Sequence, residues 1–289
     1  MGRAKVSVRE IGPDDTDRVS RFLHAQLNPR VPVPAWAALL RPPWATDAAP
    51  NHGVQLVDAE EQVVGAYLAV YSTRAGGRRR VCNLAAFCVV EEHRLHALRL
   101  VRSLLNQQGF VFTDLSPSGN VPAMNERLGF HHLDTTTRLV LNLPAPRGRV
   151  RVTEDPAALQ ATLTGWDATV YRDHREAPAA RHLLVDDGNG DGHAYLMYRR
   201  DRRKRLPVFA SPLHVGGNAG VLERAWPAVG SHLLARGLAA TLAERRVLGF
   251  TPAGPGRQLA RPRPKMYRDE PGGDAAVDYL YSELTLLQW

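Results

Sequence analysis

Apolar residues recur along the first half of the chain with the two periods that distinguish strands from helices. Residues 6–11 alternate as a strand, and the helix that follows Pro13 carries Val19 and Phe22 on one face. The same patterns predict a short helix and two strands next, at residues 34–41, 53–57 and 63–71. This opening mixes strands and helices and therefore predicts an α/β or α+β domain.

The pattern is clearest from Val81 to His132. An apolar strand (residues 81–90) leads through a polar turn (91–94) into an amphipathic helix (95–108) and a second apolar strand (110–115). A short helix then ends in the segment NERLGF, where Gly129 suits the left-handed position that follows many helices. Residues 131–133 and 137–143 are expected to close the domain as an antiparallel pair. The predicted order is thus β-α-α-β-β-β-α-β-α-β-β.

Residues 144–148 read as a linker, because proline and glycine interrupt both periods. The second half repeats the sequence of elements more faintly, with strands at 183–185, 194–198, 207–213 and 239–242 and a helix at 221–236. A final strand is expected at 277–286, with Tyr279, Tyr281 and Glu283 on one face. We expect domains at 1–146 and 147–289, the second either a degenerate copy of the first or a plain α+β appendage.

The strand, turn, helix and strand of residues 81–115, followed by Leu-Gly-Phe at 128–130, resemble the GNAT acyltransferase superfamily. The resemblance implies a tandem fold of mixed, mostly antiparallel twisted sheets flanked by helices. It implies a donor, acetyl-CoA or another acyl-CoA, from which an acyl group passes to an amine by direct attack. The expected acceptor is a small-molecule amine or an amino-acid-like compound, which the second half would help to bind.

A helix N-terminus can hold the pyrophosphate of coenzyme A on its free N–H groups. The family motif Arg/Gln-x-x-Gly-x-Gly/Ala aligns with Arg94, Ala97 and Arg99, so both glycines are replaced. The resemblance implies that donor-binding residues lie on the preceding strand, in this turn and after the next strand: Phe87, Val89, Val90, Arg94, Ala97, Leu98, Arg99 and Asn120. Three interpretations of this turn and helix remain open. It is an acyl-CoA site with altered geometry, a site that has lost CoA and binds another acyl donor or no donor, or a surface helix with scattered basic residues.

Aminolysis of a thioester needs a base for the amine and support for the leaving thiolate. Asp114 interrupts an apolar strand near its C-terminal end and is the best base by position, although a buried, paired Asp is an alternative. Asn125 stands where the family often has a tyrosine that protonates the thiolate, and Ser116 is the next candidate for that role. Three residues of the polar turn 91–94 are alternative proton acceptors: Glu91, Glu92 and His93.

The net charge of +8 indicates a general affinity for anions. The basic run at 199–205 fits a solvated hairpin tip, or a loop that faces phosphate or RNA. The basic segment 261–265 is extended and could contact an anionic substrate or the CoA 3′-phosphate. Two rival functions stay open: a transferase of the same fold that uses aminoacyl-tRNA, and a binding module that has lost the chemistry.

Cys82 and Cys88 share one predicted strand, where an even separation places both on the same face, about 20 Å apart and too far to bridge. The two reduced thiols and the absence of a signal-like N-terminus predict a cytoplasmic protein. No long apolar run is present, so no membrane contact is expected. We expect a monomer or homodimer. No Cys/His metal spacing or phosphate-binding loop of the Walker type appears, so no metal is expected.

Overall fold

A computed structural model describes residues 6–44, 49–74, 79–146, 148–190, 192–203, 206–269 and 276–288. The first part of the chain forms β1 (Ser7–Glu10), η1 (Pro13–Asp15), α1 (Thr16–Gln26), α2 (Val33–Leu40), β2 (Gly53–Val57), β3 (Val63–Arg74), β4 (Arg79–Val89), η2 (Glu91–His96), α3 (Ala97–Leu105), β5 (Phe110–Asp114), α4 (Val121–Arg127), β6 (His131–His132) and β7 (Thr137–Leu141). The second part forms β8 (Arg151–Thr153), α5 (Pro156–Thr162), α6 (Gly165–His174), β9 (Arg181–Asp186), β10 (Ala194–Arg203), β11 (Leu206–Gly217), α7 (Ala219–Arg224), α8 (Trp226–Ala235), β12 (Ala240–Glu244), α9 (Arg245–Leu248), β13 (Gly256–Gln258), β14 (Met266–Arg268) and α10 (Glu283–Leu286).

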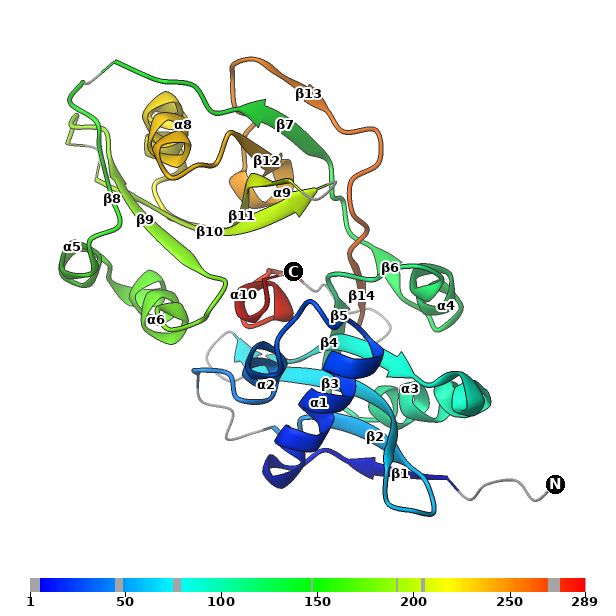
Figure 1. Ribbon diagram of the computed structural model, residues 1–289. Coiled ribbons are helices and arrows are strands. Elements are labelled where there is room, and N and C mark those ends of the chain that lie inside the picture. The colour runs from blue at the N-terminus through cyan, green and yellow to red at the C-terminus, as the bar shows by residue number, and fades with distance from the viewer. Residues whose placement is uncertain are drawn as a thin grey trace.

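The strands form two sheets of seven with the same internal pattern (Figure 1). The first runs β1-β2-β3-β4-β5-β14-β6 and the second β8-β9-β10-β11-β12-β7-β13. In each, four antiparallel strands come first, a parallel pair follows (β4 with β5, β11 with β12), and two antiparallel strands complete the sheet. The predicted fold class, mixed and mostly antiparallel sheets flanked by helices, is confirmed.

The two sheets exchange one strand each. Strand β7 leaves the first half and pairs with β12, while β14 returns from the second half and pairs with β5 and β6. The expected antiparallel pair of residues 131–133 with 137–143 is therefore wrong: β14 takes that place beside β6. The division of the strands between the sheets also does not follow the expected boundary at residue 146.

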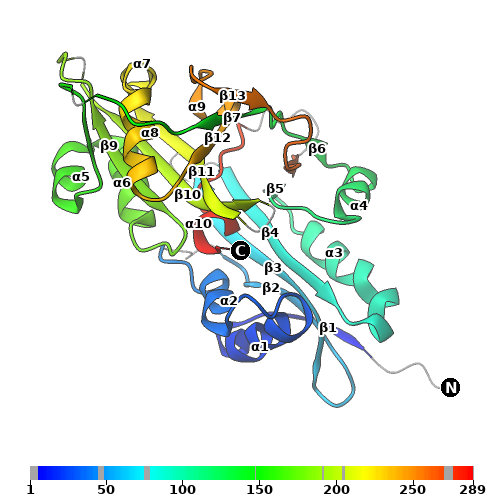
Figure 2. The same cartoon turned by 45° about the horizontal axis from the view of Figure 1, so that its top comes forward.

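The core has three apolar clusters, which define the layers. Side chains of α3 pack on one face of the first sheet and those of α1 and α2 on the other. Helices α7 and α8 cover the outer face of the second sheet. The largest cluster lies between the sheets and includes α5, α6 and residues 277–287. Figure 1 and Figure 2 both show α10, in this last segment, between the two sheets.

The C-terminal segment is not the expected strand at 277–286. Tyr281 has a φ of +54°, and α10 starts at Glu283 with the Ser282 hydroxyl accepting from the Leu284 N–H. Ser282, Glu283 and Thr285 are as deeply buried as their apolar neighbours. Alternation of polar and apolar residues therefore did not mark an exposed face here, since the Glu283 and Thr285 side chains and the Glu283 N–H bond to protein groups instead of water.

A bulge in β4 changes the face of its later residues. Ala86 has a φ of +50°, and the register with β3 shifts by one between Tyr67 and Leu68. As a result Cys82 packs in the cluster beside α3, whereas Cys88 packs against the cluster between the sheets. The expectation that both thiols share a face is wrong, but both are free.

Two further expectations concern helices. Gly129 ends α4 with a φ of +84°, which confirms it as the left-handed residue after a helix. The expected single helix at 221–236 is two helices, α7 and α8, because the chain breaks at Ala225 and Pro227 begins a new first turn.

Candidate functional site between the two sheets

The parallel strands at the centre of the first sheet separate before they end. Strand β4 pairs with β5 only from Arg80 to Asn83, although β4 itself continues to Val89. The bulge at Ala86 lies just beyond this point. Among the described strands, none pairs with the open side of residues 84–89. Peptide groups on that side can therefore bind the amides of an extended ligand.

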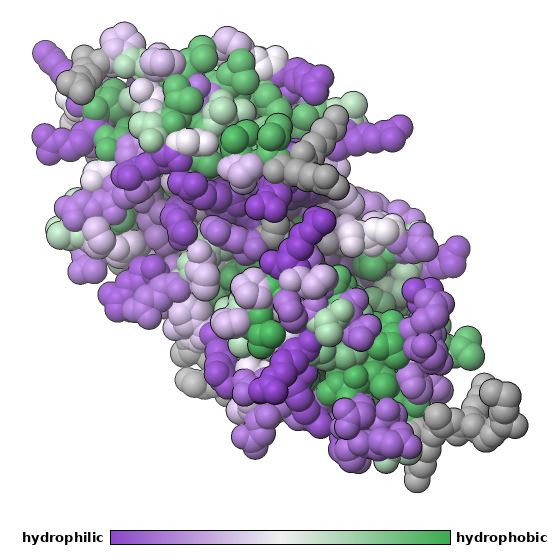
Figure 3. Space-filling view, viewed as in Figure 1, coloured by the Kyte–Doolittle hydropathy of each residue, from purple (hydrophilic) through white to green (hydrophobic). Residues whose placement is uncertain are grey.

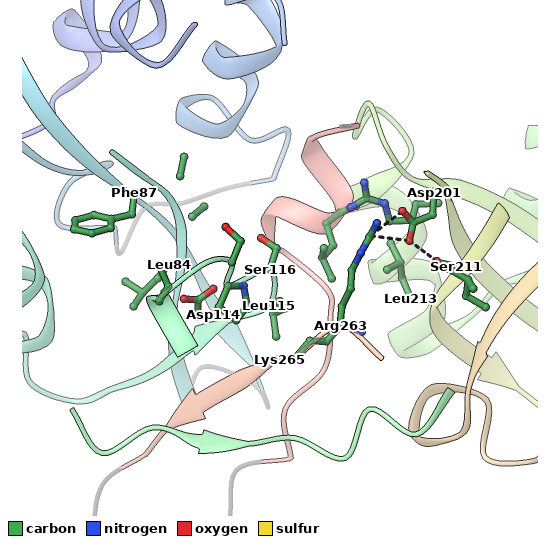
Figure 4. A pocket seen from close by; sticks show the side chains of 18 of the residues that line it. Leu84, Phe87, Asp114, Leu115, Ser116, Asp201, Ser211, Leu213, Arg263 and Lys265 are labelled. Carbon is green, nitrogen blue, oxygen red and sulfur yellow. Dashed lines mark hydrogen bonds and ion pairs between the residues drawn. The ribbon is translucent and has the colours of Figure 1, made fainter. Parts of the chain in front are cut away.

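A cavity of about 490 Å³ begins at this opening and reaches across to the second sheet. Its volume falls in the usual range for small-molecule sites, roughly 300–1,000 Å³. Figure 4 shows Leu84, Phe87, Asp114 and Ser116 at one end and Asp201, Ser211 and Arg263 at the other. In the space-filling view, hydrophilic residues gather in a band where the two halves of the molecule meet (Figure 3).

Asp114 and Ser116 line the end of the cavity beside β5, and the fully buried Glu283 is bonded to Ser116. The Asp114 Oδ2 accepts a hydrogen bond from the Asn125 amide at 2.8 Å. The Ser116 hydroxyl donates to Glu283 Oε1 at 2.7 Å, and the Glu283 N–H donates to Asn83 Oδ1 at 3.0 Å. We call Asp114, Ser116 and Glu283 the acidic cluster. It joins the end of β5 to the start of α10, which are 167 residues apart in the sequence.

Both carboxyl groups of the acidic cluster resist ionisation. Burial and the nearby Glu283 raise the pKa of Asp114 to about 7, although bonds from Asn125 and the Ser116 N–H act in the opposite direction. The pKa of Glu283 is also raised, because this side chain is completely buried. Asp114 lines the cavity and can exchange a proton near neutral pH, as a general base must.

The opposite end of the cavity is charged, and we call it the charged end. It is formed by β10, β11, β12 and the segment before β14, through Arg199, Asp201, Arg203, Ser211, Glu244, Arg263 and Lys265. Asp201 accepts from Arg263 at 2.8 Å and from the Ser211 hydroxyl at 2.9 Å. Burial acts to raise the pKa of Asp201, but Arg263 and Arg199 outweigh it and hold that pKa below its usual value.

The charged end also contains an ion pair between Lys265 and Glu244, which in turn accepts from the Tyr279 hydroxyl. Arg199 is buried and donates to the carbonyls of Leu284 and Leu287, at 3.3 and 3.0 Å. The prediction of a solvated hairpin tip for the basic run 199–205 is therefore wrong at Arg199 and Asp201. Both side chains are buried, because they lie on β10 and face inward. Arg200 and Arg202 are exposed, and residues 204 and 205 lie outside the described part of the chain.

The predicted catalytic residues fall into two groups. Asp114 and Ser116 both line the cavity. Asn125 is buried behind Asp114, where its amide holds the carboxylate, and this contact does not aim it at a thiolate. The alternative proton acceptors Glu91, Glu92 and His93 lie in η2, outside the cavity lining.

The predicted donor-binding residues are more dispersed. Phe87 lines the cavity and packs on Tyr67, with ring centroids 4.7 Å apart. The Val89 and Val90 backbone is paired with β3, Val90 donating to Val64 at 3.0 Å. Asn120 precedes the first turn of α4.

The residues of the pyrophosphate motif surround the start of α3. Arg94 is exposed and ion-paired with Glu91 at 2.7 Å. Ala97 begins α3, and the Leu98 side chain is half exposed. Arg99 donates to the Val6 carbonyl at 2.9 Å, so its guanidinium is held at the edge of the sheet. Both arginines are exposed, and each already has one protein partner: Glu91 for Arg94 and the Val6 carbonyl for Arg99.

Sequence reasoning missed most of the charged end and the role of Glu283. Glu283 was expected on a strand face, and Arg199, Asp201 and Glu244 carry no motif. Two signals were available, the basic run 199–205 and the basic segment 261–265, and an anionic partner was considered for each. Arg263 and Lys265 of this segment do line the cavity, where each pairs with a carboxylate.

The described residues carry neither a metal-binding cluster nor a membrane-spanning helix. Within them, no group of three or more His, Cys, Asp or Glu side chains could hold a metal ion. Nor do these residues contain a helix with the length and apolar character needed to cross a membrane.

Comparison with known proteins gives matches at the level of structure. No family model matches the sequence, and no curated protein does. A GCN5-related glucosamine N-acetyltransferase region of a fungal multi-domain β-N-acetylglucosaminidase aligns with 93% of the chain at a TM-score of 0.59 and 13% identity. The chain spans 38% of that longer protein.

Two further structures cover more of their own length. A GCN5-related N-acetyltransferase from Anabaena variabilis aligns with 91% of the chain and 72% of its own, at a TM-score of 0.56 and 10% identity. A putative acetyltransferase from Pyrococcus horikoshii aligns over 99% of the chain and 96% of its own, at a TM-score of 0.54 and 12% identity. At these identities the likeness concerns the fold, which extends through both sheets.

Proposed function

Because the chain has the fold of the GNAT N-acetyltransferases, we propose that it transfers an acyl group from a coenzyme A thioester to an amine. The observation that carries the proposal is the opening between β4 and β5, which leads straight to a carboxyl group with a pKa of about 7. An extended donor can lie along the open side of β4, with its reactive end in the cavity. Acetyl-CoA is the simplest donor of this class.

The chemistry requires two proton transfers. Asp114 takes one proton from the ammonium group, and the resulting amine attacks the thioester carbonyl. The new C–N bond forms, the C–S bond breaks, and the second amine proton goes to the leaving thiolate. No acyl-enzyme forms. The Ser116 hydroxyl donates its hydrogen bond to Glu283, so the Ser116 Oγ is free to accept a hydrogen bond from the amine and orient it.

Donor binding is expected to depend on Arg94. Calorimetric titration with CoA and acetyl-CoA at low salt should give micromolar dissociation constants. Arg94→Ala should weaken binding roughly three- to tenfold, because an exposed charge contact to phosphate is lost. Arg102→Ala, an exposed arginine further along α3, is the matched control and should bind like the wild type.

Absence of binding at millimolar CoA would contradict the proposal. The same protein should then be tested with aminoacyl-tRNA, the donor of the rival transferase, for which the net charge of +8 is favourable. A tRNA-dependent product would replace acyl-CoA as the donor.

A further inference from the structure

The charged end of the cavity has more cations than anions. Arg199, Arg203, Arg263 and Lys265 face Asp201 and Glu244, which is four positive groups against two negative ones. Asp201 is occupied by Arg263 and Ser211, and Glu244 by Lys265 and Tyr279. The direct contacts of the two carboxylates are therefore with residues other than Arg199 and Arg203.

Among the described residues, the other two arginines make no hydrogen bond or ion pair to a carboxylate, although Asp201 lies near enough to act on the charge of both. Arg199 is buried and donates to three neutral carbonyls, those of Arg200, Leu284 and Leu287. Arg203 lines the cavity, and its Nε is buried without a hydrogen-bond partner among the described residues. A buried cation or donor without a partner destabilises a protein, unless a ligand supplies the missing acceptor. A carboxylate or phosphate would do so, and arginine binds both with paired hydrogen bonds.

The apolar part of the cavity lining indicates the chemical character of the middle of the ligand. Besides its polar groups, the cavity is lined by apolar side chains from both halves of the molecule, namely Leu84, Leu115, Leu213, Leu242 and Leu284. Figure 4 shows Asp114 and Ser116 on one side and Arg263 with Asp201 on the other, with Lys265 between. One molecule that fills this space has different groups at its two ends and an apolar body.

We propose that the acceptor is an amine whose far end carries an oxyanion, with Arg203 and Arg199 binding the oxyanion while the amine faces Asp114 and Ser116. This proposal rests on the proposed function, because it names the acceptor class of the same site. An ω-amino acid or a short peptide with a free C-terminus has the required form. An amine that ends in a phosphate has it too.

The test compares acceptors that differ only at the far end. With acetyl-CoA as donor, acetylation of 6-aminohexanoate and 8-aminooctanoate is measured against their amides, hexylamine and 6-aminohexyl phosphate. The acid should exceed its amide in kcat/KM by about tenfold or more, because the amide leaves the arginines unpaired. A higher rate for the phosphate would identify phosphate as the preferred oxyanion. Amides or hexylamine that equal the acids would overturn the proposal.

A pair of variants assigns the effect to the charged end. Arg203→Met should reduce the acid-to-amide ratio toward one. Arg202→Met removes the same charge one residue earlier, where the side chain is exposed, and should keep the wild-type ratio. If Arg203→Met instead raises the KM for acetyl-CoA and keeps the ratio, the charged end serves the donor, and the inference is wrong.

Failure of the proposed function is recognised separately. If no amine is acetylated and CoA does not bind, the wild type is titrated calorimetrically with 6-aminohexanoate and with 6-aminohexanamide. A preference for the acid that Arg203→Met abolishes would support the oxyanion site without acyl transfer. Equal or undetectable binding of both compounds would overturn it.

Discussion

Asp114→Asn is expected to lower kcat/KM for acyl transfer by roughly 10²- to 10⁴-fold, the usual contribution of a general base. Asparagine has nearly the same shape and can still accept a hydrogen bond from Asn125, so the fold should persist. Steady-state kinetics measure the loss, and circular dichroism checks the fold. Asp17→Asn, an exposed change of the same kind on α1, should retain wild-type activity.

The pH dependence of Asp114→Asn provides a sharper criterion. Asp114 acts as a base only after it loses its proton, and its pKa is about 7. Wild-type activity should therefore rise with pH and be half-maximal near pH 7, and this limb should vanish in the variant. Stability runs the other way: because the folded-state pKa of this carboxyl is raised, its contribution falls as pH rises from about 4 through 7. A rising limb that survives in Asp114→Asn would show that another group is the base.

Arg199→Met is expected to lower the free energy of unfolding by about 1–3 kcal/mol, the usual cost of buried acceptors that lose their donor. The substitution leaves the carbonyls of Leu284 and Leu287 without their donor and deprives Asp201 of a nearby cation. The C-terminal segment should loosen and carry Glu283 away from Ser116. Urea unfolding measures the effect.

Arg202→Met serves as the control for this prediction too, and should change the unfolding free energy by no more than about 0.5 kcal/mol. Equal midpoints for Arg199→Met and Arg202→Met would mean that the contacts of Arg199 with the C-terminal segment do not stabilise the protein.

Local patterns predicted most elements of the first half, because one face of each strand or helix there is apolar. They could not predict which strands pair across the molecule. Strand β14 has only three residues, Met266–Arg268, and nothing in them specifies β5 and β6 as neighbours. The bulge at Ala86 escaped for a related reason, because an extra residue breaks the period of two without leaving a glycine or proline as a signal.

A residue of the candidate site could be predicted where its side chain differs in polarity from the rest of its strand or helix. Asp114 was predicted in this way, as a carboxylate that ends an apolar strand. Glu283 and Arg199 were not, because their importance comes from Ser116 and from the carbonyls of α10, which are distant in sequence. The sequence showed that both glycines of the family motif are replaced at Ala97 and Arg99. It could not show that Arg99 donates to the Val6 carbonyl, because periodicity does not predict such a contact.

The exchange of β7 and β14 has a consequence during synthesis of the chain. Strand β5 emerges from the ribosome about 150 residues before β14, the neighbour that covers its edge. At roughly 5–20 residues per second, that edge waits for about 8–30 s. An uncovered strand edge readily pairs with another nascent chain. Dense polysomes or slow translation between residues 140 and 266 should therefore favour aggregates, and a chaperone that shields strand edges should raise the yield of native protein.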